Sequence, residues 1–247
     1  MKPKSRRQRL DLLLVERGLA ESQQKAQAMI LAGEVRLNNV LVQKAGMPVA
    51  EDAQLEVKSR HLKYASRGGL KLEGALEDFG INPAGLICLD VGASTGGFTD
   101  CLLQKGAERV YAVDVNAAQL AWKLQQDPRV VGIERNAREL KRDFPEPVDL
   151  VVADVSFISV RKILASASAC AKHSATLLIL IKPQFELPRE DVGPGGIVQD
   201  VRLHEKAIAN VRKCAEATGL TCLSVRPSRL TGAEGNQEYF LHARKDS

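Results

Sequence analysis

The sequence lacks the features that mark several common protein classes. Only 4% of its 247 residues are aromatic, and its five cysteines form no Cys-x-x-Cys pair. Zinc ribbons and dithiol redox motifs are therefore disfavoured, and no metal site is expected. The cysteines are interpreted as small buried hydrophobes of a reduced, cytoplasmic protein.

Long apolar runs are also missing. The longest apolar stretch, residues 175–181, contains Thr176 and has the length of a strand rather than of a membrane-spanning helix. The N-terminus is basic, but no apolar run follows it as a signal peptide requires. No association with a membrane is therefore expected.

Missing motifs disfavour three further classes of site. No Gly-x-Ser-x-Gly elbow is present, and the histidines lack positions suited to a Ser-His-Asp hydrolase. No cysteine falls at the end of an expected strand, where a nucleophile for cytosine carbon-5 methylation would be needed. The glycine-rich turn described below lacks the Lys-Ser/Thr pair of a triphosphate-binding loop.

Charge is unevenly distributed along the chain. The net charge is +5, but residues 1–71 hold 14 Lys and Arg against 7 Asp and Glu, and the remainder is slightly acidic. A basic segment ahead of a near-neutral one predicts an arm that binds a polyanion, attached to a separate catalytic body. The alternative is a basic surface that is merely solvated.

The basic segment has the pattern of a small α+β domain. Apolar residues at helical spacing predict two helices within residues 10–31, the second capped by Ser22. Short strands are expected at residues 35–37, 40–42 and 54–58.

This pattern resembles the RNA-binding module of ribosomal protein S4 over about residues 8–58. The sequence departs from it at Ser22-Gln23, where Ser-Arg is usual, and at Asn38-Asn39, where Asn-Gly is usual; asparagine also tolerates the positive φ of a tight hairpin. The resemblance implies phosphate contacts that position the protein without reading sequence. The basic residues expected to make them are Arg6, Arg7, Arg9, Lys25, Arg36, Arg60, Lys63 and Arg67. A small packing or dimerisation domain is the alternative.

The most informative stretch is the run Leu-Asp-Val-Gly-Ala-Ser-Thr-Gly-Gly-Phe at residues 89–98. A buried strand ends at Asp90 and leads through a glycine-rich turn into a helix, a layout typical of nucleotide-type sites in open α/β sheets. A second strand, at residues 110–113, ends at Asp114, which can accept hydrogen bonds from both hydroxyls of an adenosine ribose. Taken alone, the glycines indicate no more than a turn.

The two acids favour one cofactor. Asp90 would repel a phosphate, whereas S-adenosylmethionine carries an adenosine, a sulfonium cation and no phosphate. The residues expected to bind this cofactor are Asp90, Gly92, Ala93, Ser94, Thr95, Gly96, Gly97, Phe98, Asp114, Val115, Asn136 and Asp154. An acid at a strand end can instead cap a helix, and a loop asparagine can simply form a turn.

Strands and helices alternate beyond Asp114. Helices are expected at residues 117–126, 160–172 and 201–218, and strands at residues 130–133, 150–153 and 177–181 and around Leu223 and Tyr239. The alternation predicts an α/β fold with a doubly wound, Rossmann-like parallel sheet. Ligands bind at the carboxyl ends of such strands, where Asp154 and Lys182 are expected to join Asp90 and Asp114.

The body resembles the FtsJ-like ribose 2′-O-methyltransferases, which use a Lys-Asp-Lys-Glu set. The matching runs are Ser66-Arg67-Gly-Gly-Leu-Lys71-Leu72, Ala153-Asp154-Val-Ser, Ile181-Lys182-Pro-Gln-Phe-Glu and Gly235-Asn236-Gln-Glu238-Tyr-Phe. The resemblance implies that Lys71, Asp154, Lys182 and Glu238 are catalytic, with Lys182 nearest the reacting hydroxyl. Without the resemblance, Lys71 is interpreted as a surface lysine and Glu238 as an edge-strand salt-bridge partner.

The chain as a whole resembles the TlyA, or haemolysin A, family of ribosomal RNA methyltransferases. Its expected parts are an RNA-binding domain (1–60), a linker with a leading helix (61–84) and a methyltransferase domain (85–247). The resemblance implies S-adenosylmethionine-dependent methylation of cytidine 2′-hydroxyls in ribosomal RNA within ribosomal subunits, without a stable protein partner. Three alternatives are an RNA-binding protein without activity, a small-molecule methyltransferase and a membrane-lytic protein; no amphipathic membrane helix supports the last.

Overall fold

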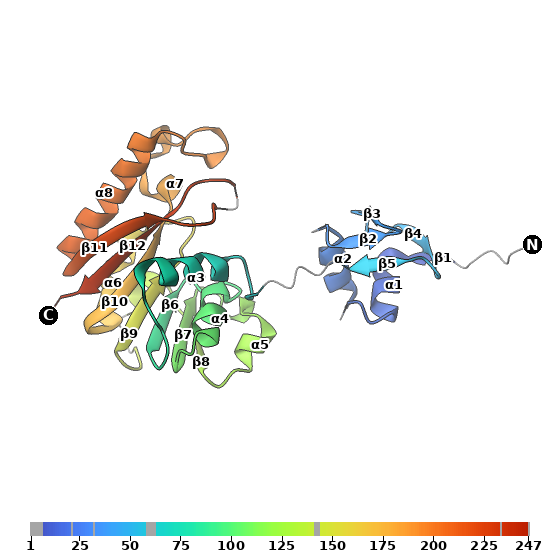
Figure 1. Cartoon of the computed structure of the whole chain (residues 1–247), viewed down its shortest axis with the longest axis horizontal. Coiled ribbons are helices and arrows are strands. Elements are labelled where there is room, and N and C mark those ends of the chain that lie inside the picture. The colour runs from blue at the N-terminus through green and yellow to red at the C-terminus, as the bar shows by residue number, and fades with distance from the viewer. Residues whose placement is uncertain are drawn as a thin grey trace, which may run out of the picture. The chain divides into compact units, whose positions relative to one another are not determined.

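The computed structural model describes residues 7–20, 22–31, 33–57, 63–140, 144–232 and 234–246. The chain divides into two compact units, Met1–His61 and Leu62–Ser247, shown in Figure 1. Each unit has its own hydrophobic core. Each is described by itself below.

The first unit contains two helices and two small sheets. Its elements are β1 (Arg7–Arg9), α1 (Leu10–Glu16), α2 (Gln23–Leu31), β2 (Val35–Leu37), β3 (Val40–Leu41), β4 (Pro48–Ala50) and β5 (Leu55–Val57). The sheet orders are β1-β4 and β3-β2-β5. The expected helices and hairpin are confirmed: Ser22 Oγ accepts a hydrogen bond from the Lys25 amide at 3.2 Å, and Asn38 and Asn39 have φ of 48° and 67°.

A buried carboxylate joins the two helices of this unit. Asp11 is fully buried. It accepts hydrogen bonds from Arg9 Nε and Nη2 at 3.0 and 2.7 Å, and from the amides of Gln23 and Gln27 at 3.0 and 2.8 Å. The Arg9 guanidinium holds the pKa of Asp11 well below its usual range. Asp11 therefore fixes α1, α2 and the Arg9 side chain together.

The second unit is built on one seven-stranded sheet of order β11-β12-β10-β9-β6-β7-β8. The strands are β6 (Ile87–Val91), β7 (Arg109–Asp114), β8 (Val130–Glu134), β9 (Val148–Ala153), β10 (Ala171–Ile181), β11 (Leu220–Pro227) and β12 (Tyr239–Lys245). The neighbouring pairs from β8 to β10 are parallel. β12 is antiparallel to both β10 and β11. The doubly wound α/β class with a mostly parallel sheet is confirmed. At this edge β12 is antiparallel, because a loop rather than a helical crossover joins β11 to β12.

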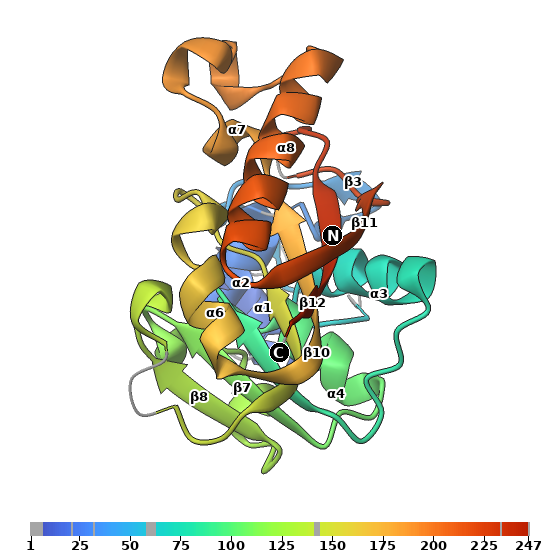
Figure 2. The ribbon, with the colours of Figure 1, turned by 90° about the vertical axis from the view of Figure 1, so that its left-hand side faces the viewer.

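Helices cover both faces of this sheet (Figures 1 and 2). The helices are α3 (Gly68–Phe79), α4 (Gly97–Gln104), α5 (Trp122–Gln125), α6 (Leu164–Cys170), α7 (Pro183–Glu186) and α8 (Val201–Ala217). Successive residues of a strand point to opposite faces of the sheet and so join two different hydrophobic cores. Leu89 and Val151 pack on the side of α6 and α8, while Cys88 and Val152 pack on the side of α3 and α4. The continuous apolar runs of these strands follow from burial on both faces.

Two expected helices are shorter than the periodicity predicts. Residues 117–126 form a 3₁₀ turn, Ala117–Gln119, and the short α5, separated by extended backbone at Leu120 and Ala121. The break lets the Ala121 amide donate to the Thr95 carbonyl at 3.1 Å. Similarly, residues 160–172 form a 3₁₀ turn, Val160–Lys162, then α6, and β10 already begins at Ala171.

We expect Asp11→Ala to destabilise the first unit by about 1–3 kcal/mol, because it removes the buried carboxylate to which the side chains of Arg9, Gln23 and Gln27 donate. Hydrogen exchange of the α2 amides should accelerate accordingly, while the β9 amides of the second unit stay unchanged. Asp52→Ala, at an exposed acid of the same unit, is the control. Equal effects of the two substitutions would contradict the role given to Asp11.

Candidate active site

The carboxyl ends of four parallel strands meet at one edge of the sheet. Val91 of β6 pairs with Val113 of β7 and with Ala153 of β9, and Ala153 pairs with Ile179 of β10. The structure therefore brings Asp90, Asp114, Asp154 and Lys182 to this edge from segments up to 92 positions apart. The register that does so is set by the hydrophobic strands themselves.

The turn after β6 requires its glycines. Gly92 and Gly96 have φ of +85° and +89°, in the left-handed region that glycine enters without strain. A Cβ on Gly92 would collide with the Asp154 carbonyl, and one on Gly97 with the Ser66 hydroxyl. The turn therefore lies directly against the loop after β9 and the start of α3.

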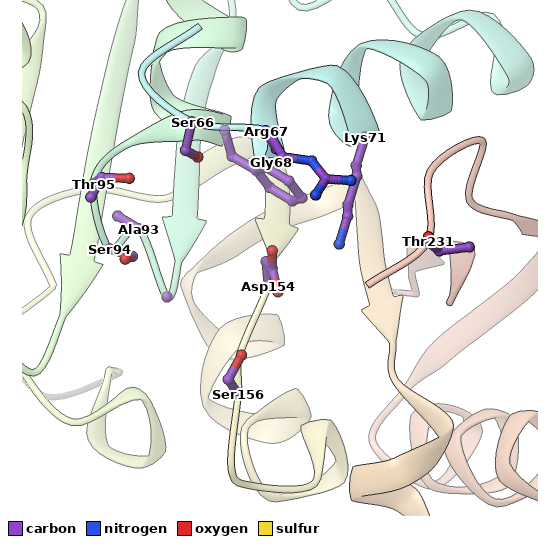
Figure 3. Close-up of a pocket in the computed structure, with 13 residues that line it drawn as sticks. Ser66, Arg67, Gly68, Lys71, Ala93, Ser94, Thr95, Asp154, Ser156 and Thr231 are labelled. Carbon is purple, nitrogen blue, oxygen red and sulfur yellow. The ribbon is translucent and has the colours of Figure 1, made fainter. Parts of the chain in front are cut away.

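Three adjoining cavities open at this edge. The first, of about 290 Å³, lies between the glycine turn and the start of α3 and is lined by Ser66, Arg67 and Lys71 (Figure 3). The second, of about 370 Å³, extends along Asp114 and Asn136. The third is about 360 Å³. Ser156 lines all three, so they form one continuous site with distinct compartments.

Asp114 stands on the wall of the second cavity and also shapes the turn. Its carboxylate accepts the Ser94 amide at 2.9 Å and the Asn116 amide at 3.1 Å. A carboxylate has about four acceptor positions, so two remain for a ligand. Asn136 caps the following 3₁₀ turn by accepting the Arg138 amide at 3.1 Å, and Val115 contributes an exposed apolar wall.

Asp90 does not line any of these cavities, contrary to the sequence-based expectation that it faces the ligand. Strand alternation directs it toward α4, where it is fully buried and accepts the Thr99 hydroxyl at 2.7 Å. Its second oxygen accepts no hydrogen bond from the described part of the chain. Burial raises the pKa of Asp90 to about 7. Asp90 therefore joins β6 to α4 beneath the glycine turn.

The four residues matched to the Lys-Asp-Lys-Glu set form two ion pairs. Lys71 Nζ lies 2.6 Å from Glu238 Oε2, and these side chains are only 11% and 3% exposed. Lys182 Nζ lies 2.5 Å from Asp154 Oδ1 and donates a hydrogen bond to Ser156 Oγ at 2.7 Å. Lys71, Lys182 and Glu238 all line the third cavity. The structure thus assembles the set from α3, the ends of β9 and β10, and the loop before β12.

Surrounding residues hold these pairs in place. Gly232 leaves room for Glu238, since a Cβ there would lie 2.7 Å from Glu238 Oε1. Arg229, in the same loop, bonds Glu77 and Asp78 of α3 at 2.6 and 2.7 Å. The helix that carries Lys71 and the loop that carries Glu238 are therefore fastened to each other at two places.

Several residues that line the site were not singled out from the sequence. They are Ser66, Gly68, Val155, Ser156, Phe157, Ile158, Gln184 and Thr231. Phe157 is 89% exposed and has a φ of +66°, which is strained for a bulky residue. The position of residues 155–158 directly after a strand-end acid could have indicated them, but neither the exposure nor the backbone of Phe157 is readable from sequence.

The residues expected to contact RNA fall into different environments. Arg7, Lys25 and Arg36 lie in the first unit, in β1, α2 and β2, while the charge of Arg9 is paired with Asp11. Arg6 and Arg60 lie outside the described residues.

Lys63 and Arg67, the other two residues expected to contact RNA, belong to the second unit. Lys63 forms an ion pair with Glu73 at 2.5 Å. Arg67, expected to contact RNA, lines the first cavity beside the glycine turn. Its guanidinium is therefore available to an anionic group bound in that cavity.

Within the described ranges, no cluster of three or more His, Cys, Asp or Glu is arranged to hold a metal ion. No helix in that part of the chain is both long enough and apolar enough to cross a membrane.

The family comparisons agree with this geometry. The FtsJ-like methyltransferase family model matches residues 64–245, and the S4 domain model matches residues 8–55. The protein is therefore a methyltransferase of the FtsJ-like class with an S4 domain.

Individual relatives identify the family more closely. The chain is 47% identical over 246 residues to the 16S/23S rRNA (cytidine-2′-O)-methyltransferase TlyA of Mycobacterium tuberculosis, covering 97% of this chain and 91% of the relative. It is 44% identical over 237 residues to hemolysin A of Brachyspira hyodysenteriae, covering 95% and 98%. A solved structure named as a hemolysin, from Streptococcus thermophilus, has a TM-score of 0.74 at 38% identity and covers 98% and 89%. The chain belongs to the TlyA, or hemolysin A, family.

We expect Asp90→Asn to change how the stability of the second unit depends on pH. Folding raises the pKa of Asp90 from 3.8 to about 7, so the folded state binds more protons than the unfolded state between these values. The stability of the wild type relative to the variant should fall from about pH 4 to about pH 7, by up to about 1.4 kcal/mol per pH unit, and level off above.

Hydrogen exchange of the β6 and β9 amides across this pH range measures the difference. Glu108→Gln, at an exposed acid of the same unit, is the control and should run parallel to the wild type. A parallel curve for Asp90→Asn would contradict the proposed burial of this carboxyl group.

Proposed function

We propose that the protein transfers a methyl group from S-adenosylmethionine to the ribose 2′-hydroxyl of a cytidine in ribosomal RNA. The observation that carries the proposal is the set of two ion pairs, Lys71 with Glu238 and Lys182 with Asp154. Three of these side chains line the third cavity, and Asp154 lines the first and second. The name of the M. tuberculosis relative supports the ribosomal substrate and the cytidine.

The residues of the first two cavities fit this cofactor. Asp114 has acceptor positions for the ribose hydroxyls, and Val115 and Ile158 offer apolar walls for the adenine. Arg67 faces the first cavity, where it can pair with the amino-acid carboxylate of the cofactor. The close packing that Gly92 allows brings the backbone of the turn against the ligand. Asp154 lines both cavities and places a negative charge between them.

The ion pair between Lys182 and Asp154 suits the chemistry of a ribose hydroxyl. The bound cofactor supplies a methyl group on a positively charged sulfur, so the leaving group departs as a neutral thioether. What this chain must add is orientation and control of one proton. Lys182 Nζ, held by Asp154 and Ser156, is placed to bind the 2′-oxygen. As a neutral amine it would accept the hydroxyl proton, and as an ammonium it would stabilise the negative charge that develops on the 2′-oxygen as that proton leaves. Lys71 and Glu238, which line the same cavity, help to position the nucleotide.

The third cavity has an aromatic wall suited to a nucleobase. The rings of Phe157 and Phe185 have centroids 5.8 Å apart, and both line the cavity. Unpaired bases of RNA are commonly stacked on aromatic side chains. The solvent exposure of Phe157 is therefore explained by a base that it receives.

The first unit supplies affinity for RNA. Its match to the S4 domain and the basic charge of residues 1–71 support contacts to phosphates. We assign ribosomal subunits as the partner and the cytoplasm as the location on the same grounds. The catalytic unit thus needs to recognise only the local structure around its target.

We expect Lys182→Ala to abolish methyl transfer while leaving the affinity for S-adenosylmethionine largely unchanged, because Lys182 lines the third cavity and neither of the two assigned to the cofactor. Transfer of radiolabel from the cofactor to unmodified ribosomal subunits, followed by mapping of 2′-O-methylation, measures the first property; calorimetry measures the second. Lys172→Ala, on the strand β10 that precedes Lys182 but paired with Asp149, is the control. Normal turnover by Lys182→Ala would refute the role assigned to Lys182.

We expect Phe157→Ala to slow methylation of subunits by about 5- to 150-fold, the range for loss of one base stack. The factor by which the methylation rate falls should exceed the factor by which the affinity for S-adenosylmethionine changes. Trp122→Ala removes another exposed aromatic, which lies outside the three cavities, and should have little effect. A larger loss of cofactor affinity than of RNA methylation would assign Phe157 to the cofactor instead.

A further inference from the structure

One polar group on the wall of the third cavity is unaccounted for by the chemistry above. Gln184 is the carboxamide among the described residues that line this cavity. Its Oε1 is buried, yet it accepts no hydrogen bond within the described ranges of the chain. A buried acceptor left without a donor costs about 1–3 kcal/mol, so its retention calls for a functional explanation.

The backbone that carries Gln184 is firmly held. Pro183 occupies the first turn of α7, with Lys182 as its N-cap, and the Phe185 amide donates to the Lys182 carbonyl at 2.9 Å. Glu186 is 2% exposed and accepts hydrogen bonds from the Ser159 hydroxyl at 2.5 Å and the Val160 amide at 2.7 Å. The unpartnered oxygen therefore belongs to a fixed position two residues from the proposed catalytic lysine.

Three charged groups of the cavity are engaged with neighbours, and the fourth, Glu234, is exposed and offers Gln184 no donor because a carboxylate only accepts. Lys71 and Glu238 are paired with each other, and Lys182 is paired with Asp154 and bonded to Ser156. The donor that Gln184 lacks is therefore best supplied by a ligand, and a neutral N–H group suits a neutral carboxamide.

We propose that Gln184 determines the base specificity of the enzyme by pairing with the Watson–Crick edge of the target cytidine; this rests on the proposed function. Cytosine presents an amine donor at N4 beside an acceptor at N3. A carboxamide is complementary, since Oε1 accepts from the amine and Nε2 donates to N3. Uracil presents the reversed pattern, so the carboxamide would have to turn over and bury its NH₂ group where Oε1 now lies.

The placement is consistent with the roles of the neighbouring residues. Lys182 acts at the ribose, Phe157 and Phe185 offer the stacking surface, and Gln184 lines the same cavity and lies between Lys182 and Phe185 in the sequence. A single short segment, residues 182–185, together with Phe157, would then hold one nucleotide by its ribose, by the face of its base and by the Watson–Crick edge of that base.

The experiment compares ribosomal subunits that carry C or U at the mapped target position. We expect the wild type to methylate C faster than U by about tenfold to a hundredfold, corresponding to about 1.4–2.8 kcal/mol. Gln184→Leu should lower the rate on C by a similar factor, leave the rate on U nearly unchanged, and so bring the ratio of the two rates close to one.

Two further variants complete the test. Gln184→Asn keeps a carboxamide but withdraws it by one methylene, and should also lose the preference for C. Gln126→Leu removes an exposed glutamine outside the cavities and should behave as the wild type. Melting temperature and cofactor affinity, measured for every variant, show whether each folds and keeps its cofactor site.

The outcomes separate the two proposals. If Gln184→Leu slows C and U equally, or keeps the preference for C, Gln184 does not read the base, while the methyltransferase assignment stands. Equal rates of the wild type on C and U likewise overturn the specificity proposal alone. If the wild type, with cofactor bound, methylates no ribosomal RNA, the proposed function itself fails, and the specificity proposal fails with it.

Discussion

The ion pair between Lys71 and Glu238 is the constraint on which the architecture of the site depends. It joins a helix that precedes the first strand of the sheet to a loop that precedes β12, 167 positions later. A buried pair is costly to desolvate and becomes strongly unfavourable if one partner is lost. It is therefore a weak source of stability but a strict geometric requirement. The Arg229 clamp onto Glu77 and Asp78 and the space left by Gly232 both serve to meet that requirement.

Buried polar atoms without a hydrogen-bond partner and a strained backbone mark the places in the second unit that lower its free energy of unfolding. Asp90 and Gln184 each hold a side-chain oxygen without a donor from the described residues, and Phe157 holds a strained backbone. All three lie near the carboxyl edge of the sheet, Asp90 in β6, Gln184 in α7 and Phe157 in the loop after β9. Concentration of such local costs at one edge is typical of functional sites, where the rest of the fold over-determines the geometry.

Much of this arrangement is predictable from the sequence, because it follows from periodicity. Apolar runs ending in Asp90, Asp114, Asp154 and Lys182 indicate parallel strands, and parallel strands place their ends together. The direction of Asp90 was predicted wrongly, since alternation along β6 turns it toward α4. The orientation of β12, the β1–β4 pair and the exposure of Phe157 depend on tertiary contacts that no local pattern encodes. Lys71 and Glu238 could be matched only through family resemblance, since neither follows an expected strand.

The position of β12 also has a consequence for how the protein is made. β12 follows the other six strands of the sheet in the chain, yet it lies between β10 and β11 rather than at an edge. During synthesis, the glycine turn and the strands around it emerge first, whereas Glu238, which directly precedes β12, emerges with the strand that fills the gap. The strands around the glycine turn can therefore pair before Glu238 is available to Lys71. Insertion of β12 into the sheet and completion of the buried ion pair are thus one event.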